Sequence, residues 1–175
     1  MSGSLLLWLT LALVVFWSVG VYNRLMRMRA RGLGALGSVM KHLRVYAELL
    51  RGHAMQPPAD AVADEWLQLL ACLQTLEVVL KDATASALMQ GSPAKLGQAF
   101  DAAHAAWHQV SDSQQKTTHA AMPAVLRDQL VLAAQRVGTA REGFNQLLTK
   151  YNQALVQFPA SLVVSTMGFK PGDML

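Results

Sequence analysis

The sequence predicts an all-α protein in which an N-terminal transmembrane helix continues into an antiparallel bundle of about four long helices. Three observations lead to this fold class. Residues 5–21 contain no charged side chain. Farther along the chain, apolar residues recur at alternating spacings of three and four, which is typical of helical bundles. No stretch combines strand-like alternation with flanking turn signals, so a sheet is not expected.

Residues 5–21 form the predicted membrane anchor. Their sequence, LLLWLTLALVVFWSVGV, is just long enough for a helix to cross a hydrocarbon core of about 30 Å. The residues before it include no basic side chain, and no A-x-A cleavage site follows it, which argues against a cleaved signal peptide. We therefore predict an uncleaved anchor, preceded by a short extracytoplasmic N-terminus of residues 1–4.

Basic side chains follow the anchor directly. Residues 22–51 carry seven lysines and arginines against Glu48 alone, whereas residues 52–175 carry eight basic and ten acidic side chains. Under the positive-inside rule, this asymmetry places residues 22–175 in the cytoplasm. Nucleic acid is not expected as a partner, because the basic stretch is tied to the bilayer. A predicted surface for anionic lipid consists of Arg24, Arg27, Arg29 and Arg31.

Four stretches carry the bundle pattern, and each places its apolar side chains along one seam of a helix. The breaks between them agree with the pattern. Pro57-Pro58 follow the first stretch, Ser92 is the predicted N-cap of the third with Pro93 as its first helical residue, and Pro123 begins the fourth. The predicted core residues are Leu36, Val39, Leu43, Tyr46 and Leu50, then Val62, Trp66, Leu69, Leu73, Leu76, Leu80, Ala83 and Ala87, then Leu96, Phe100, Ala103, Trp107 and Val110, and finally Leu126, Leu130, Ala133, Val137, Ala140, Phe144, Leu147, Tyr151, Ala154 and Phe158.

The C-terminal tail, residues 159–175, is predicted to lie near the membrane. With short links, neighbouring helices run antiparallel. If the first helix leaves the bilayer, the fourth helix returns toward it and ends at Phe158-Pro159. The tail then packs at the lipid surface, through apolar residues such as Phe169 and the basic Lys170, or it packs on the bundle alone.

The hexapeptide GLGALG, residues 32–37, has the G-x-G-x-x-G spacing of dinucleotide-binding loops. Such a loop follows a strand and opens a helix within a βαβ unit, and neither element is expected here, so we predict no nucleotide or other cofactor. Two interpretations remain. Ala30, Gly34 and Ser38 form a small-residue strip where another helix packs closely, or the glycines form a soft joint between anchor and bundle.

Two asparagines, Asn145 and Asn152, lie seven residues apart in the predicted fourth helix and share one of its faces. We expect each side-chain amide to form hydrogen bonds to a neighbouring helix, because an interior polar residue commonly specifies helix pairing. Contact with a partner or a ligand is the alternative role.

Residues that would support catalysis are few. His104 and His108 share one helix face and form a possible two-ligand metal site, with Asp101 or Asp112 as a further ligand. The pair lacks the glutamate of the H-E-x-x-H motif. We therefore expect packed or solvated histidines, no metal and no catalytic residues, and we interpret the lone Cys72 as a small buried hydrophobe.

Two segments of the chain match the sequence pattern of a known protein family at several positions. YNRLMRMRARGLGALGSVMKHLR, residues 22–44, has matching residues at Tyr22, Asn23, Leu25, Arg29, Arg31, Ala35 and Leu43 but departs from the pattern at Leu36, Gly37 and Met40. AREGFNQLLTKYNQALVQFPASLVVSTMGFKP, residues 140–171, ends in matches at Phe158, Pro159, Gly168, Phe169, Lys170 and Pro171. Both segments resemble the LemA family. The resemblance implies an α-helical, membrane-anchored bacterial protein.

The sequence favours a noncatalytic, membrane-anchored assembly or scaffold protein of the bacterial inner membrane that self-associates. Long apolar seams and a charged fraction of only 15 % support this function. An accessory subunit of a membrane protease or quality-control complex is one alternative, and a metal- or nucleotide-dependent enzyme is another. The expected partners are the lipid bilayer, including anionic lipid, a second copy of the chain, and another membrane protein.

Overall fold

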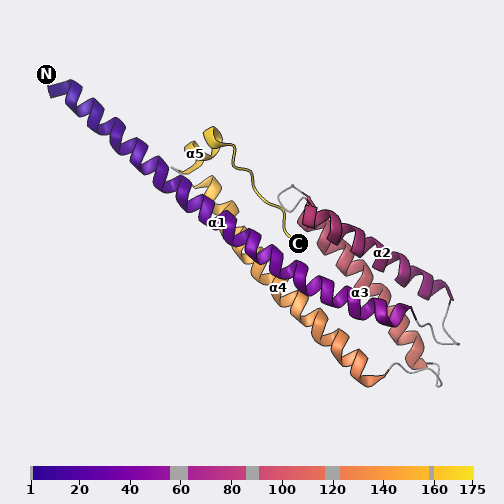
Figure 1. Ribbon diagram of the computed structural model, residues 1–175. Helices are drawn as coiled ribbons and strands as arrows, with labels where there is room; N and C mark the ends of the chain where they lie inside the picture. Colours follow the sequence, from indigo (N-terminus) through magenta and orange to yellow (C-terminus); the bar gives the residue numbers. More distant parts are fainter. Residues whose placement is uncertain (1, 56–62, 86–90, 117–122, 158–159) are drawn as a thin grey trace.

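The chain is helical over most of the residues that the computed structural model describes, which are 2–55, 63–85, 91–116, 123–157 and 160–175 (Figure 1). These ranges contain no strand, so the predicted fold class is confirmed. The helices are α1 (Ser2–Ala54), α2 (Ala63–Ala85), α3 (Ser92–Lys116), α4 (Ala124–Val156) and α5 (Ala160–Met167).

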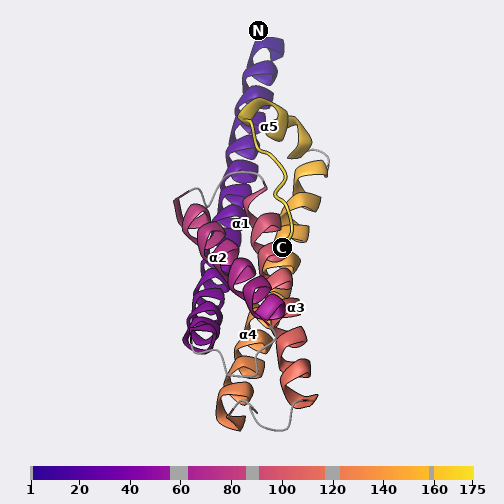
Figure 2. The ribbon, with the colours of Figure 1, turned by 90° about the vertical axis from the view of Figure 1, so that its right-hand side faces the viewer.

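Successive long helices run in opposite directions, with α1 beside α4 and α2 beside α3 (Figure 1). At 1.5 Å per residue, the 53 residues of α1 span about 80 Å and the 33 residues of α4 about 50 Å. With 23 and 25 residues, α2 and α3 are much shorter. They therefore cover only one end of the α1–α4 pair, the end opposite the N-terminus (Figure 2).

Two regions follow from these lengths. The four-helix region consists of α2, α3 and the parts of α1 and α4 that they cover. The junction consists of residues 21–36 of α1, residues 144–156 of α4, α5, and the C-terminal segment of residues 168–175. In Figure 2, α5 lies beside α1 where α1 begins to project beyond the other helices.

The predicted seams form the core. Every predicted core residue of the first three stretches is buried wherever the structure describes it. In α4, Leu148 is buried, whereas Leu126, Ala140 and Leu147 are only half-buried. A strict seven-residue repeat drifts around a helix with 3.6 residues per turn, which explains the shift to Leu148. The predicted Pro57-Pro58 break and the core positions Val62, Ala87 and Phe158 lie outside the described residues.

The start of α3 differs from the prediction by one residue. The carbonyl oxygen of Gly91 accepts a hydrogen bond from the Lys95 amide at 3.2 Å, so Gly91 caps the helix. Ser92 is consequently the first helical residue and not the N-cap. Pro123 precedes the first residue of α4, as predicted.

The glycine-rich hexapeptide lies inside α1, which runs through residues 32–37 without interruption. A dinucleotide-binding loop needs a turn between a strand and a helix, and a continuous helix does not provide one. The loop that the spacing suggests is therefore not present at residues 32–37.

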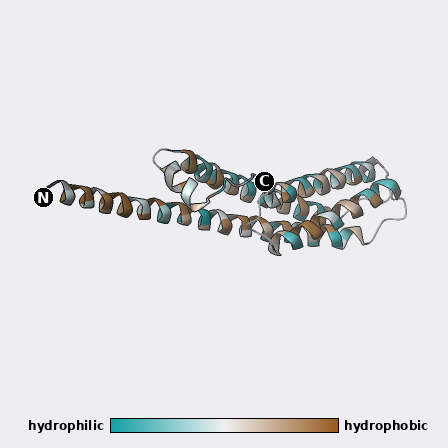
Figure 3. Cartoon of the chain, turned by 90° about the horizontal axis from the view of Figure 1, so that it is seen from above, coloured by the Kyte–Doolittle hydropathy of each residue, from teal (hydrophilic) through white to brown (hydrophobic). Residues whose placement is uncertain are grey.

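The first part of α1 is apolar on every side and projects beyond the bundle (Figure 3). Among the described residues, α1 is the one helix that is long and apolar enough to cross a membrane, and its most apolar stretch is not covered by the rest of the chain. Length and composition are therefore compatible with a membrane anchor near the N-terminus.

Candidate functional site

The junction begins where α5 packs against α1. Phe169 meets Tyr22 edge to face, with ring centroids 5.7 Å apart, and Val164 of α5 also packs against the core. Gly168 ends α5 in a left-handed conformation with φ of 69°, which favours glycine because it has no Cβ. The chain turns at this residue and runs back along α4 (Figure 1).

Two asparagines of α4 hold the returning segment. The Nδ2 group of Asn152 donates to the carbonyl oxygen of Gly172 at 2.9 Å, and its Oδ1 accepts from the Gly172 amide at 3.0 Å. Asn145 makes the same two bonds with Leu175, at 3.1 and 3.0 Å. Each amide thus satisfies both backbone groups of one residue, as a neighbouring β-strand would.

The asparagine partners differ from those that the sequence predicts. We expected bonds to a neighbouring helix, and this expectation is wrong, because Asn145 and Asn152 bond to the backbone of the C-terminal segment. The seven-residue spacing correctly indicated that both amides are paired on one helix face. An extended segment leaves no periodic pattern in the sequence, so its role as the partner was not visible.

The end of the segment also approaches α3 closely. A Cβ atom on Gly97 would lie 2.9 Å from the backbone carbon of Leu175, so only glycine allows this approach without displacement of the segment. At the same level, Arg141 of α4 forms an ion pair with Asp101 of α3 at 2.8 Å. The C-terminal segment therefore contacts α3 and α4 at one end and α1 and α4 at the other.

The junction contains a cavity of about 350 Å³ that is partly open to solvent. Its walls come from α1, the start of α3, α4, α5 and the C-terminal segment, and most of the residues that line it are apolar or aromatic. Three charged side chains line it, Arg29, Lys170 and Asp173, and the Asp173 carboxylate accepts a hydrogen bond from the Gly91 amide at 2.7 Å. The remaining lining residues are Tyr22, Met26, Met28, Gly32, Leu33, Leu36, Pro93, Phe144, Leu147, Leu148, Tyr151, Met167, Gly168, Phe169, Pro171 and Gly172.

Tyr151 connects the cavity wall to the C-terminal segment. Its hydroxyl group donates a hydrogen bond to the carbonyl oxygen of Lys170 at 3.2 Å. Burial raises the pKa of the Tyr151 phenol, and the nearby Arg29 guanidinium opposes that rise. The phenol therefore stays protonated and remains a donor at physiological pH.

The structure brings together residues that the sequence marked separately. The motif residues Gly168, Phe169, Lys170 and Pro171 all line the cavity, and so does one residue of the basic cluster, Arg29. Phe158 and Pro159 lie outside the described residues. Sequence reasoning did not identify the three cavity methionines, Met26, Met28 and Met167, because nothing in the sequence relates the two segments that carry them.

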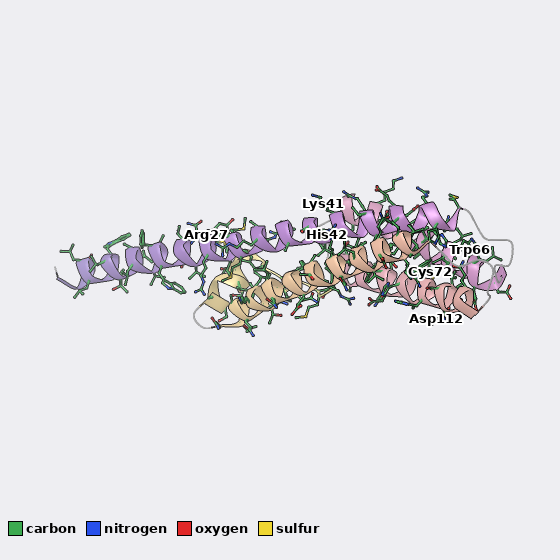
Figure 4. All side chains as sticks on the ribbon, turned by 90° about the horizontal axis from the view of Figure 1, so that it is seen from below. Arg27, Lys41, His42, Trp66, Cys72 and Asp112 are labelled. Carbon is green, nitrogen blue, oxygen red and sulfur yellow. The ribbon has the colours of Figure 1, made fainter. Side chains whose placement is uncertain are left out.

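The other basic residues lie elsewhere on α1. Arg24, Arg27 and Arg31 are exposed and do not line the cavity. The Nε group of Arg27 donates to the carbonyl oxygen of Asn23 at 3.3 Å. Figure 4 shows Arg27 on the part of α1 that passes α5, at the opposite end of the bundle from Trp66.

The predicted small-residue strip faces outward. Ala30, Gly34 and Ser38 are exposed, and a Cβ atom on Gly34 would find open space within 4 Å. The strip therefore does not serve for close packing against α4.

The histidine pair lies on α3, away from the junction. The Nε2 atoms of His104 and His108 are 3.1 Å apart, and the Tyr46 hydroxyl is 3.1 Å from Nδ1 of His104. Burial lowers the pKa of His104 most, His108 lowers it further, and Asp101 raises it. Asp101 is paired with Arg141. No group of three metal-ligating side chains occurs within the described residues.

A comparison with protein families identifies the family to which the chain belongs. A model of the LemA family matches residues 79–175, which is more than half of the sequence and includes α4, α5 and the C-terminal segment. No curated protein and no solved structure matches the chain. The N-terminal resemblance, residues 22–44, lies outside the matched residues. The chain thus belongs to the LemA family.

Proposed function

We propose that the protein is a noncatalytic, membrane-anchored scaffold of the bacterial inner membrane. Residues 5–21 cross the bilayer once, residues 1–4 lie outside the cell membrane, and residues 22–175 form the cytoplasmic bundle. By restricting the bundle to the membrane plane, the anchor raises the effective concentration of any partner that is held there too.

The observation that carries this proposal is the continuity of α1. Its first part exposes large apolar side chains on every side, including Trp8 at 65 % and Phe16 at 81 %. The same helix then supplies Leu25 and Leu43 to the core, each 1 % exposed. An apolar surface of this length is unfavourable in water and favourable in a bilayer. A continuous helix makes the anchor and the bundle one unit.

Single-cysteine labelling tests the proposed orientation. Ser4→Cys and Gln153→Cys, each in a Cys72→Ser background, are exposed to a membrane-impermeant maleimide in whole cells with a permeabilised outer membrane. We expect labelling of Ser4→Cys before lysis and of Gln153→Cys only after lysis, because basic residues follow the anchor. Labelling of both positions from the same side contradicts a single crossing.

The exposed strip on α1 supports self-association. Ala30, Gly34 and Ser38 allow the backbones of two helices to approach closely, and among the described residues no atom lies within 4 Å of a Cβ placed on Gly34. We propose that a second copy packs there, next to the membrane.

Native mass spectrometry of the full chain in mild detergent measures this association. Gly34→Leu is expected to give monomers, whereas Gly138→Leu, an equally open glycine on exposed α4 surface, is expected to leave the oligomer intact. A wild-type monomer contradicts self-association. An intact Gly34→Leu oligomer contradicts the role of the strip and favours the soft-joint interpretation.

The alternatives from the sequence stay predictions. An accessory role beside a membrane protease or quality-control complex uses the same anchor and bundle. A metal-dependent enzyme draws on the geometry of His104 and His108. A zinc titration tests the metal site. Heat of binding that disappears in His108→Ala supports the site, and no heat with the wild-type chain contradicts it.

A further inference from the structure

The cavity in the junction combines apolar walls with two cations. We propose that it binds one acyl chain of an anionic phospholipid from the bilayer, with the phosphate group at Arg29 and Lys170. This proposal rests on the proposed membrane anchoring, because the bilayer supplies the lipid. It assigns a specific ligand site, which is distinct from general attraction between the membrane surface and the arginines outside the cavity, Arg24, Arg27 and Arg31.

The size and lining of the cavity suit a flexible apolar chain. Its volume of about 350 Å³ lies at the lower end of the range for ligand sites, which is roughly 300–1,000 Å³. Met26, Met28 and Met167 line it from two different elements. Methionine side chains are unbranched and adapt to irregular neighbours, so they can follow an acyl chain with many conformations.

The charges favour an anionic headgroup. Arg29 of α1 and Lys170 of the C-terminal segment both line the cavity, so a phosphate that binds both would join the two elements. The one acidic side chain of the lining, Asp173, already accepts a hydrogen bond from the Gly91 amide. Two cations and one anion leave the lining with a net positive charge.

The cavity also lies where lipid is available. Tyr22 directly follows the apolar stretch of residues 5–21 along α1, and Phe169 of the C-terminal segment packs against its ring. Aromatic side chains of this kind commonly lie at the level of lipid headgroups. A lipid therefore needs to move only a short way from the bilayer to enter the cavity.

A lipid suits the cavity better than a segment of another protein. An extended peptide requires partners for its backbone amides and carbonyls. In the cavity wall, the carbonyl groups of Lys170 and Gly172 already accept hydrogen bonds from Tyr151 and Asn152. An acyl chain requires no such partner, and its methylene groups gain from contact with the apolar walls.

Photocrosslinking of the full chain in phospholipid vesicles tests the proposal. The probe is a phosphatidylglycerol with a diazirine near the end of one acyl chain, and mass spectrometry maps the products. We expect crosslinks at cavity-lining residues of α4, among Phe144, Leu147, Leu148 and Tyr151, in addition to the anchor. These α4 residues lie outside the apolar stretch, so annular lipid around the anchor does not explain such products.

Two glycine variants make the test specific. Gly32 lines the cavity, and a Cβ atom there would have no neighbour within 4 Å, so Gly32→Leu adds side-chain volume at the cavity wall. We expect about tenfold fewer α4 crosslinks, because the new side chain occupies the ligand volume. Gly37→Leu is the matched control, since Gly37 is exposed on the same helix and does not line the cavity.

Two arginine variants test the headgroup. Arg29→Gln is expected to lower the preference for the anionic probe over a phosphatidylcholine probe by about fivefold, because it removes one of the two cations assigned to the phosphate in the cavity. Arg31→Gln, the loss of an exposed arginine outside the cavity, is expected to leave that preference unchanged. An equal effect of both substitutions overturns the assignment of the phosphate to Arg29.

The failures of the two proposals are distinguishable. Crosslinks in residues 5–21 without crosslinks in α4 overturn the lipid site and leave the anchor intact. Absence of crosslinks in both places overturns the anchor itself. Crosslinks in α4 that persist at the wild-type level in Gly32→Leu overturn the acyl-chain position.

Discussion

The four-helix region and the junction are held together by different means. In the four-helix region, apolar side chains close on one another, and Leu50, Leu69 and Leu76 are completely buried. In the junction, two helices, a short third helix and an extended segment meet around a cavity. Side-chain amides bonded to backbone groups, from Asn145 and Asn152, fix the segment there.

The comparison shows how one pair of helices serves two purposes. α1 and α4 pass through both regions, so the packed core at one end can stabilise an incompletely filled space at the other. Regions with fewer packed apolar contacts open at a lower cost in free energy. We therefore expect the junction to be the region that changes when lipid or a partner binds.

Leucine truncation is expected to give the largest difference between the regions. Leu50→Ala removes a completely buried side chain and should lower the free energy of unfolding by about 2–5 kcal/mol. Leu148→Ala should cost less, because Leu148 is 8 % exposed and already faces the cavity. Fluorescence of Trp66 and Trp107 during urea unfolding, with Trp8 and Trp17 replaced by Phe, measures both. Equal losses contradict the distinction between the regions.

Removal of one asparagine amide is expected to have a smaller and local effect. Asn152→Ala deletes both hydrogen bonds to Gly172, each with a net value of about 0.5–1.5 kcal/mol. Amide hydrogen exchange should accelerate in residues 168–175 and stay unchanged in α2 and α3. Gln153→Ala, at the exposed neighbouring position, is the control. Acceleration in both regions would mean that the segment is not held independently.

Acidification is expected to have the smallest effect, confined to the four-helix region. The His53 ring lies between Trp66 and Trp107, and burial lowers its pKa below the ordinary value of 6.5. The unfolded chain therefore binds a proton that the folded chain excludes. The free energy of unfolding falls as pH drops from 6.5 through the lowered folded-state pKa, with no further loss from this group below it.

Replacement of His53 by phenylalanine keeps an aromatic ring at this position but removes the group that titrates. His53→Phe should reduce the stability difference between about pH 7.5 and about pH 5.5, as measured by urea unfolding. His104 has the same direction of shift, so the variant should keep part of the difference. An unchanged difference in His53→Phe assigns the pH dependence to other groups.

The helices were predictable because their signal is local. Leu43, Tyr46 and Leu50 repeat every three or four residues, and the structure buries all of them in one seam. The junction was not predictable in the same way. α5 is a single short apolar helix, and the path of the C-terminal segment depends on bonds from Asn145 and Asn152 to backbone groups. Nearly every residue type has a backbone N–H and a carbonyl group, so the sequence of the C-terminal segment contains no pattern that indicates these hydrogen bonds.

The glycines illustrate the same limit. Their spacing alone indicated a loop, and the surrounding helical pattern correctly argued against it. The sequence did not reveal that Gly32 and Gly34, two residues apart, face different surroundings, the cavity and open space. That difference arises from the position of α4 and the C-terminal segment relative to α1.

We propose that α1 is one continuous helix, in which residues 5–21 face lipid and the residues that follow them form part of the junction. A nitroxide scan of residues 5–36 in phospholipid vesicles, read by collision with oxygen and with a nickel chelate, tests it most directly. We predict high oxygen access throughout residues 5–21, and then a period of about 3.6 residues with minima at Leu25 and Leu36. Equal access of the chelate to residues 5–21 and 22–36, without that period, would contradict the claim.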